Sequence, residues 1–424
     1  MMKEDVMSRS TTPMAHLTRL VELGPRPVGS PAHGATAGYI ADVLGGLGYE
    51  VERQAWPFPS WQEEETQLTL GGEALAAAAN GFSPSCDVAA PFVALGTLAE
   101  LAAAELAGRI AVLYGELTRE PLAPKANRVY NPPAHQALIR ELEAKAPLAA
   151  ITVNPSAGSL ARIITDWELA IPSVTVPAEV GRRLLGQAGA EIHLRIASRR
   201  GPGEACNVVA RRPGTRRERL VLAAHYDTAI DAPGAVDNAS GVAVLLAIAE
   251  RLARGNLRLG VELVAFGDEE SGGHGDELYL QHYGLEAIPV FSGLPTPRDG
   301  ERLGYTLAAI NVDGVGQAVG VNTVTSLACS EAFGALVASV AAAHPGVSVV
   351  APWPASNHYT FFSHGVPAVA LGSVGVANIM HTPADTADWV SGHKLDEALA
   401  LVAELLAALQ DKDLDWCRSE RQSG

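Results

Sequence analysis

The sequence has few cysteines, few basic residues and no long apolar run, and each shortage argues against a class of protein. Its four cysteines, spread over 424 residues without close-paired spacing, favour free thiols over a disulfide framework or a cysteine-ligated metal. A net charge of -16 argues against a nucleic-acid-binding face, which needs a basic surface. No stretch approaches the roughly 20 apolar residues that span a membrane. The polar segment 1–9 lacks the apolar core of a secretory signal, so we expect a cytoplasmic protein.

The composition is that of a globular protein with room for two or three domains, since 48% of its residues are hydrophobic and 18% are charged. Residues 1–62 and 203–415 carry helical patterns that alternate with apolar strand patterns. Residues 63–202 are rich in short apolar runs typical of strands. We therefore predict an α/β fold with a doubly wound, mostly parallel sheet flanked by helices, interrupted by a β-rich inserted domain and followed by a C-terminal tail at 416–424.

Acidic residues and histidines follow the apolar runs of the second flank. The runs 219–224, 259–266, 306–310 and 368–371 are typical of buried strands, and 240–252 is typical of a helix. The candidate residues at the ends of these elements are His225, Asp227, Asp237, Glu269, Glu270, Asp313 and His381. Ligands of a doubly wound sheet bind outside the carboxyl ends of its strands, so these side chains are predicted to share one crevice. Imidazole and carboxylate groups that converge in this way are ligands for a divalent metal.

The motifs at these positions resemble those of one enzyme family. They are His-x-Asp from 225, Gly-x-x-Asp-Asn-x-Ser-Gly from 234, Glu-Glu-x-Gly from 269, Asn-x-Asp-x-x-Gly from 311 and His-Thr-x-x-Asp-Thr from 381. In this order they resemble the co-catalytic di-zinc aminopeptidases, a group that includes aminopeptidase S, aminopeptidase Y, glutamate carboxypeptidase and the glutaminyl cyclases. The resemblance covers the chain outside the insert.

The resemblance implies a ligand set for two zinc ions per chain. Asp237 would bridge both ions. His225 and Asp313 would complete one site, and Glu270 and His381 the other. Two such ions share a water, lower its pKa and polarise the scissile carbonyl.

The resemblance also implies two catalytic residues, Glu269 and Asp227. Glu269, adjacent to a ligand, would be the general base that removes a proton and returns it to the leaving amine. Asp227 would orient the His225 imidazole by accepting its remaining N–H. Met380 departs from the family pattern, because many members have a Tyr there whose hydroxyl can stabilise the developing oxyanion. Zinc alone, or Tyr359, could replace that hydroxyl.

The segment 356–359 holds the residues that the resemblance places beside the crevice. His358 lies where family members often have a His that lines the site, and we predict that Asn357, His358 and Tyr359 contact the substrate. Two further departures occur here, since Asn357 stands where relatives usually have Asp and Asp276 stands where they usually have Ser. These departures leave the metal ligands intact but leave the side-chain preference open.

Four other charged residues have both a structural and a functional interpretation. The sequence Thr-Pro-Ala-Asp that ends at Asp385 fits a helix capping box with Pro at the first helical position, which we favour over a chemical role. Arg26 could reach the crevice, but its turn-rich surroundings favour turn stabilisation. Arg298 and Arg302 could hold a substrate carboxylate, although solvated loop charges are the favoured interpretation.

The order of strands and helices in the insert resembles the protease-associated domain, a module found inserted in peptidases. The runs 109–113, 149–153 and 172–176 carry this resemblance. A lid or spacer of another kind is the alternative. Either interpretation predicts an insertion within a divided catalytic domain, where it would limit the crevice to small or extended peptides.

The family resemblance implies a zinc-dependent exopeptidase that acts on peptide substrates, with an aminopeptidase favoured. A carboxypeptidase or dipeptidase of the same family, and a glutaminyl-cyclase-like acyltransferase, are the alternatives. A non-catalytic binding relative is disfavoured because such a protein is expected to lose metal ligands, and every ligand is present. The sequence leaves a homo-oligomer open.

Overall fold

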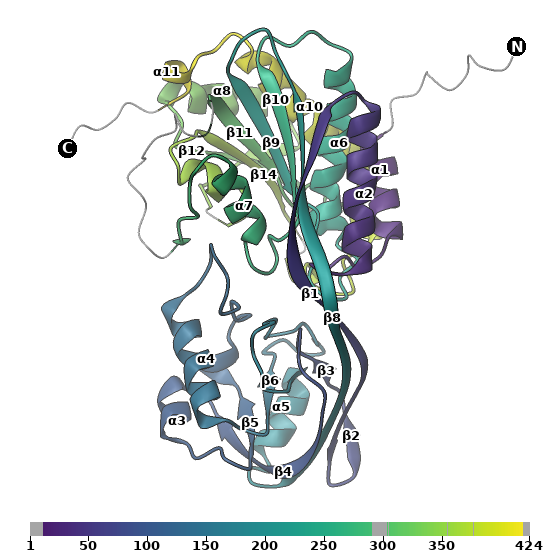
Figure 1. The fold of residues 1–424 in the computed structure, drawn as a ribbon, viewed down its shortest axis with the longest axis vertical. Helices are drawn as coiled ribbons and strands as arrows, with labels where there is room; N and C mark the ends of the chain where they lie inside the picture. Colours follow the sequence, from purple (N-terminus) through teal and green to yellow (C-terminus); the bar gives the residue numbers. More distant parts are fainter. Residues whose placement is uncertain (1–11, 291–302, 304, 354, 376, 419–424) are drawn as a thin grey trace, which may run out of the picture. The chain divides into compact units, whose positions relative to one another are not determined.

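The computed structural model describes residues 12–290, 303, 305–353, 355–375 and 377–418. Two compact units make up the fold (Figure 1). The split unit comprises the chain up to Trp56 and from Glu204 onward, and the inserted unit is Pro57–Gly203. Two long strands, β1 (Glu50–Leu70) and β8 (Glu191–Arg212), contribute residues to both units.

The strand β8 is continuous, although its sequence has the pattern of a strand only at 191–196 and from 206 onward. The stretch between them contains Gly201 and Pro202 and lacks apolar alternation, so its periodicity does not indicate a strand. It is extended because β8 pairs with β1, where the Ser60 hydroxyl donates to the Pro202 carbonyl at 3.3 Å. Pairing with a neighbouring strand outweighs local sequence preference here.

The sheet of the split unit has the strand order β13-β12-β14-β11-β9-β10-β8. Its core is four parallel strands: β14 (Ala368–Val374), β11 (Thr306–Val312), β9 (Arg219–His225) and β10 (Gly260–Phe266). β12 (Val321–Leu327) pairs antiparallel with β14, β8 pairs antiparallel with β10, and β13 (Val347–Val349) pairs parallel with β12. Because the core strands are parallel, their carboxyl ends lie at one edge of the sheet. The predicted α/β fold class is confirmed.

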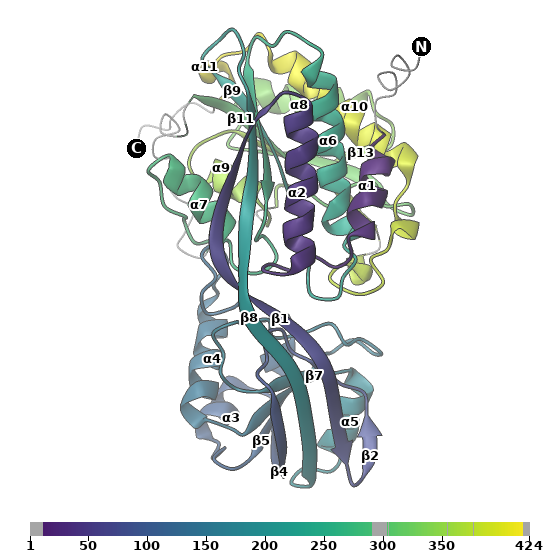
Figure 2. The same cartoon turned by 45° about the vertical axis from the view of Figure 1, so that its right-hand side comes forward.

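Helices cover both faces of this sheet (Figures 1 and 2). One face carries α1 (Pro13–Glu22), α2 (Pro31–Gly46), α6 (Ser240–Ala253) and α10 (Gly392–Leu409), and the other carries α7 (His274–His282) and α9 (His358–Phe362). Side chains of β9 alternate between the two cores, with Leu220 and Leu222 in the first and Val221 and Ala223 in the second. Helix α6 is buried along most of its length, which explains why its sequence is apolar on all sides. Helix α8 (Glu331–Ala342) packs against β12 and β13, and α11 (Leu414–Cys417) packs against α8.

The inserted unit has strands in the order β8-β4-β5-β6-β7-β3. Its elements besides β1 and β8 are β2 (Glu73–Leu75), β3 (Ala78–Ala79), β4 (Cys86–Leu95), α3 (Leu98–Ala103), β5 (Ile110–Leu113), η1 (Gly115–Thr118), α4 (Pro133–Lys145), β6 (Ala149–Val153), β7 (Ser173–Val176) and α5 (Ala178–Leu185). The sequence does not predict β4 or α3. β4 contains Pro91, and a proline within an apolar run argues against a strand because it lacks an N–H. At that residue the strand changes partner from β8 to β5.

Short helical turns complete the split unit: η2 (Ala235–Ala239), η4 (Ala377–Ile379) and η5 (Ala387–Trp389). The four cysteines are free thiols, as the sequence predicts. Within the described ranges, no helix combines the length and the apolar content that a membrane crossing requires.

Candidate metal centre

Polar side chains of the split unit meet at the carboxyl edge of its parallel strands. His225 is the last residue of β9, and Asp313 follows β11 directly. Asp237 lies in η2 before α6, Glu270 lies beyond β10, and His381 lies beyond β14 and η4. A cleft of about 570 Å³ opens at this edge. Its lining includes Asp237, Glu269, Asp313, Trp353, Ser356, Met380 and His381.

The five residues expected to bind metal form two adjoining groups that share Asp237. In the first group, His225 Nε2 lies 3.2 Å from Asp237 Oδ1 and 3.3 Å from Asp313 Oδ1. In the second, His381 Nε2 lies 2.9 Å from Asp237 Oδ2 and 3.2 Å from Glu270 Oε2. The two oxygens of Asp237 therefore face different histidines, which is the arrangement that a bridging carboxylate requires.

The donor atoms fit two divalent cations. Within each group, the candidate ligand atoms all lie within 4.8 Å of one another, and one imidazole with two carboxylates is a donor set that zinc accepts. Glu270 also carries a buried oxygen, Oε1, that has no hydrogen-bond partner among the described residues. A buried polar atom of this kind is expected to have a partner, and a metal ion would supply it.

Burial and the repulsion of neighbouring carboxylates raise the pKa values of the two adjacent glutamates, Glu269 and Glu270. Burial raises the pKa of Glu270 to about 8, and the nearby Asp237 acts in the same direction. Burial also raises the pKa of Glu269 well above its usual range, with Asp313 adding to the shift. The Glu270 carboxylate in turn raises the pKa of His381 well above its usual value. This concentration of carboxylates in a buried place favours the binding of cations.

Asp227 connects one histidine to the loop that carries both glutamates. It is fully buried, and its Oδ1 lies 3.4 Å from His225 Nδ1. The same carboxylate accepts hydrogen bonds from the backbone N–H groups of Glu269 at 3.1 Å and Glu270 at 3.0 Å. Asp227 can therefore orient the imidazole and fix the backbone of the glutamate pair at the same time.

The predicted capping role of Asp385 is wrong. No helix begins at 382–385 in this described stretch, and the next helical turn, η5, follows Thr386. The carboxylate of Asp385 is fully buried and instead accepts hydrogen bonds from Val236 N at 2.8 Å and Asp237 N at 3.0 Å. The local pattern resembles a capping box, but backbone donors 148 and 149 residues away in sequence take the carboxylate.

The three predicted substrate residues lie behind the cleft wall. Asn357 is 2% exposed, His358 is fully buried and Tyr359 is 4% exposed, and none of them is among the residues that line the cleft. The His358 ring packs edge-on against Trp353, with ring centroids 4.5 Å apart, and its Nε2 donates to the Trp353 carbonyl at 2.7 Å. Trp353 does line the cleft, so His358 contacts the cleft lining without facing the cleft itself. Met380 lines the cleft, whereas Tyr359, the suggested source of the hydroxyl that Met380 lacks, does not. Arg298 and Arg302 lie outside the described residues.

Asn357 and Asp276, two positions that depart from the family pattern, contact each other. The Asn357 amide donates to both carboxylate oxygens of Asp276, at 3.0 and 3.1 Å, and the Thr360 hydroxyl donates to the same group. Burial raises the pKa of Asp276 to about 6. The chain therefore keeps one buried carboxylate at this contact, with the acid and its neutral partner exchanged relative to the family pattern.

Replacing Asn357 with Asp is expected to destabilise the protein more at pH 8 than at pH 5. The substitution puts two buried carboxylates in contact, which raises the pKa of the pair above the unfolded value. Stability is therefore lost as the pH rises through that raised pKa, by about 3–5 kcal/mol at pH 8 for an uncompensated buried charge. Urea unfolding at both pH values measures the difference. The double variant Asp276→Ser with Asn357→Asp should recover most of the loss; an equal loss at both pH values would contradict this account.

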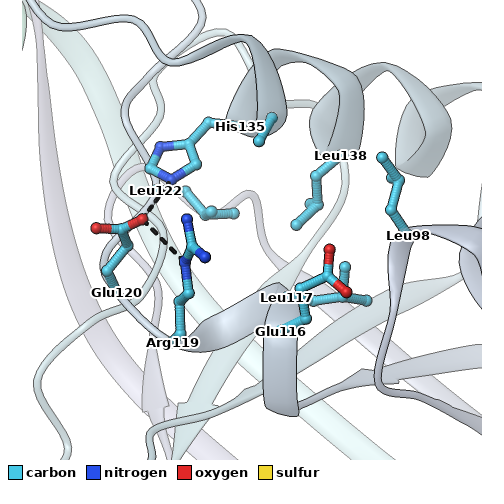
Figure 3. Close-up of a pocket in the computed structure, with 9 residues that line it drawn as sticks. Leu98, Glu116, Leu117, Arg119, Glu120, Leu122, His135 and Leu138 are labelled. Atoms are coloured by element: carbon cyan, nitrogen blue, oxygen red, sulfur yellow. Dashed lines mark hydrogen bonds and ion pairs between the residues drawn. The ribbon is translucent and has the colours of Figure 1, made fainter.

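The inserted unit contains a second, smaller cavity of about 130 Å³ (Figure 3). Three of its polar side chains pair through Glu120. His135 Nδ1 accepts a hydrogen bond from Ala123 N at 3.1 Å, so its other nitrogen carries the proton toward Glu120, 3.3 Å away. Arg119 donates to the same Glu120 oxygen at 3.2 Å. Because these groups are paired and the other lining residues are mainly leucines, Leu98, Leu117, Leu122 and Leu138, the cavity does not indicate a reaction site.

Comparison with known proteins agrees with the fold and the motifs. Residues 207–406 match the family model of peptidase family M28. This match confirms the resemblance seen in the motifs.

Curated relatives carry aminopeptidase names. The probable lipoprotein aminopeptidase LpqL of Mycobacterium tuberculosis is 27% identical over 288 residues, which are 65% of this chain and 56% of that protein. Aminopeptidase YwaD of Bacillus subtilis is 27% identical over 272 residues, 61% of this chain and 55% of that protein. The chain thus spans about half the length of these relatives.

Two solved structures share the fold over almost the whole chain. A zinc aminopeptidase from Bacillus subtilis superposes with a TM-score of 0.72, covering 98% of this chain and 97% of that one at 22% identity. An aminopeptidase from Aneurinibacillus sp. strain AM-1 gives a TM-score of 0.71, covering 96% and 94% at 22% identity. At this identity the likeness establishes the common fold.

Proposed function

We propose that this protein is a zinc-dependent aminopeptidase that hydrolyses the first peptide bond of peptide substrates. The observation that carries the proposal is the pair of metal-ligand groups that share Asp237, with the uncommitted carboxylate of Glu269 in the same cleft. The family of residues 207–406 and the names of the curated relatives support the same class of reaction.

We assign the five converging residues to two zinc ions. His225 and Asp313 would hold one ion, Glu270 and His381 the other, and Asp237 both. Zinc bound there would lower the pKa of a water and polarise a peptide carbonyl oxygen. The protein keeps the ligands in place through Asp227, which contacts His225 and the backbone of the glutamate pair.

Glu269 is assigned the proton transfers. It lines the cleft but belongs to neither ligand group, so its carboxylate is available to substrate. Its raised pKa indicates a carboxylate that holds a proton readily. It would take the proton of the attacking water and pass it to the nitrogen of the leaving amine.

The charges of the cleft favour recognition of a free amino group over a free carboxylate. Besides the shared Asp237, two acids line the cleft, Glu269 and Asp313, and both can face an ammonium group. Among the described lining residues there is no Lys or Arg to hold a C-terminal carboxylate. This difference favours an aminopeptidase over a carboxypeptidase.

Blocking the amino group is therefore expected to lower kcat/KM by about 10- to 100-fold, the loss that accompanies a charged hydrogen bond. The measurement compares leucyl and N-acetyl-leucyl chromogens, with and without a chelator, and then after zinc is restored. Efficient cleavage of the blocked substrate would favour a carboxypeptidase or dipeptidase. Release of ammonia and a cyclised product from N-terminal glutaminyl peptides would favour the acyltransferase alternative.

Four other sequence-based points stay predictions: the protease-associated character of the insert, its effect on access to the cleft, the cytoplasmic location and a homo-oligomer.

A further inference from the structure

Arg26 lies in the N-terminal segment, outside the part of the chain that matches the peptidase family, and is fully buried. Its guanidinium donates three hydrogen bonds to backbone carbonyls: Nε to Tyr226 at 2.6 Å, Nη1 to Pro233 at 2.7 Å and Nη2 to Gly234 at 2.7 Å. Its backbone N–H donates to the Thr228 hydroxyl at 3.0 Å. One side chain thus joins the end of β9 to the loop that leads into Asp237.

Asp385 holds the next residues of the same loop from their N–H groups. Its carboxylate oxygens accept from Val236 N and Asp237 N, and its carbonyl accepts from Ala235 N at 3.2 Å. The carbonyls of Pro233 and Gly234 therefore face a cation, and the N–H groups of Val236 and Asp237 face an anion. The residue at the end of this run, Asp237, is the carboxylate shared by both metal-ligand groups.

The contribution of Arg26 is geometric rather than electrostatic. Burial lowers the pKa of Arg26 to about 10, against the opposing effect of Asp227 and Asp385, so the side chain stays charged near neutral pH. A fixed positive charge close to a metal centre repels divalent cations. Its planar fork, however, satisfies three carbonyls at once, which the single ammonium of a lysine cannot do with the same geometry.

Gly234 shows how closely the loop is packed against this side chain. It has φ +59°, in the region that favours glycine, and an added Cβ would lie 2.2 Å from Thr228 Cγ2, 2.5 Å from the Asp237 carbonyl and 3.2 Å from Arg26 Nη2. No side chain fits there without displacing the loop.

We propose that Arg26 and Asp385 form a clamp that presets the backbone of residues 233–237 and so positions Asp237 for both metal ions. The two are positioning residues and touch neither metal nor substrate. The inference rests on the proposed function only in taking Asp237 as a metal ligand. It makes the N-terminal segment a structural part of the metal centre.

The test uses the full chain and two measurements that need no peptide: cobalt and zinc affinity by competition with a chelator, and hydrogen exchange of residues 235–237 in the metal-free protein.

Two variants disturb the clamp. Arg26→Lys keeps the charge, and Asp385→Asn keeps the size. Arg212→Lys is the matched control, because Arg212 also donates to two backbone carbonyls, those of Leu252 and Gly255, away from the cleft. The expected result is faster exchange of residues 235–237 and an affinity loss of about 10- to 100-fold for both metal equivalents in the first two variants, the range found when outer partners of metal ligands are removed. The control should change neither.

A second pair of variants covers the case in which the buried substitutions prevent folding. Gly234→Ala displaces the clamped loop, whereas Gly48→Ala, at φ +85° with open space around its Cβ, carries a similar backbone penalty without the collision. Only the first should weaken both metal sites. Wild-type affinity and exchange in Arg26→Lys and Gly234→Ala would overturn the clamp, as would loss of one metal equivalent alone. If the wild-type chain bound no metal, the proposed function would fail, while the exchange measurement would still decide the clamp.

Discussion

Replacing Glu269 with Gln is expected to lower kcat by about 10²–10⁴-fold, the range for loss of a general base, while zinc content and melting temperature stay near their wild-type values. Gln keeps the shape of the side chain but cannot take up the proton. Glu269 belongs to neither metal-ligand group, and its hydrogen bond to Asp227 runs through the backbone N–H, which the substitution keeps. Steady-state kinetics, metal analysis and thermal unfolding on the same preparation separate the proton-transfer role from a structural one.

The neighbouring residue provides the control for this experiment. Glu270→Gln removes a group that lies 3.2 Å from His381 and belongs to the second ligand group, so metal affinity should fall first and activity as a consequence. If Glu269→Gln lost zinc while Glu270→Gln kept two equivalents, the two roles would be reversed.

The convergence of the metal-ligand residues follows from the sequence for a clear physical reason. Apolar runs long enough for buried strands end at His225 and just before Asp313 and Glu269, and a parallel sheet brings such ends to one edge. The β9, β10, β11 and β14 pairings supply that edge. The ends of the strands therefore predict the positions of His225, Asp313 and the glutamate pair, whereas Asp237 and His381 lie further along the loops that follow β9 and β14.

The sequence has no comparable pattern that would predict the residues that hold this centre in place. Arg26 and Asp385 bond to backbone atoms that lie about 150–200 positions away, and a hydrogen bond to a distant backbone imposes no periodic pattern on either sequence. A local rule then gives the wrong role, as it does for Asp385. The contact between Asp276 and Asn357, 81 positions apart, is likewise visible only in the fold.

The burial of residues 357–359 is also not predicted by the sequence. Its residues begin the short helix α9, whose Phe361 packs into the core below β9 and β10. This anchoring turns Asn357, His358 and Tyr359 inward, and the cleft is lined by Trp353 and Ser356, which precede the helix. Sequence order places the segment beside the site correctly but does not indicate which of its residues face the cleft.

Replacing Asp237 with Asn is expected to weaken both metal sites together, because its two oxygens face different histidines at 3.2 and 2.9 Å. Asn keeps one oxygen and replaces the other with an amide nitrogen that carries two protons and cannot act as a ligand there. The loss per site should exceed the roughly 10–100-fold that follows removal of an outer partner, and activity should fall with it. Chelator competition counts the equivalents that remain.

Asp231→Asn is the matched control for that substitution, since Asp231 lies in the same loop, is exposed and loses the same charge. It should bind two equivalents at wild-type affinity. Thermal unfolding adds an independent readout, because a ligand that binds only the folded state raises the melting temperature, and a tighter ligand raises it more. Added zinc should therefore stabilise the wild-type chain and the Asp231→Asn control but leave Asp237→Asn nearly unchanged. If Asp237→Asn lost only one equivalent and kept a zinc-dependent rise in melting temperature, Asp237 would belong to a single site, and the two groups would hold their ions independently.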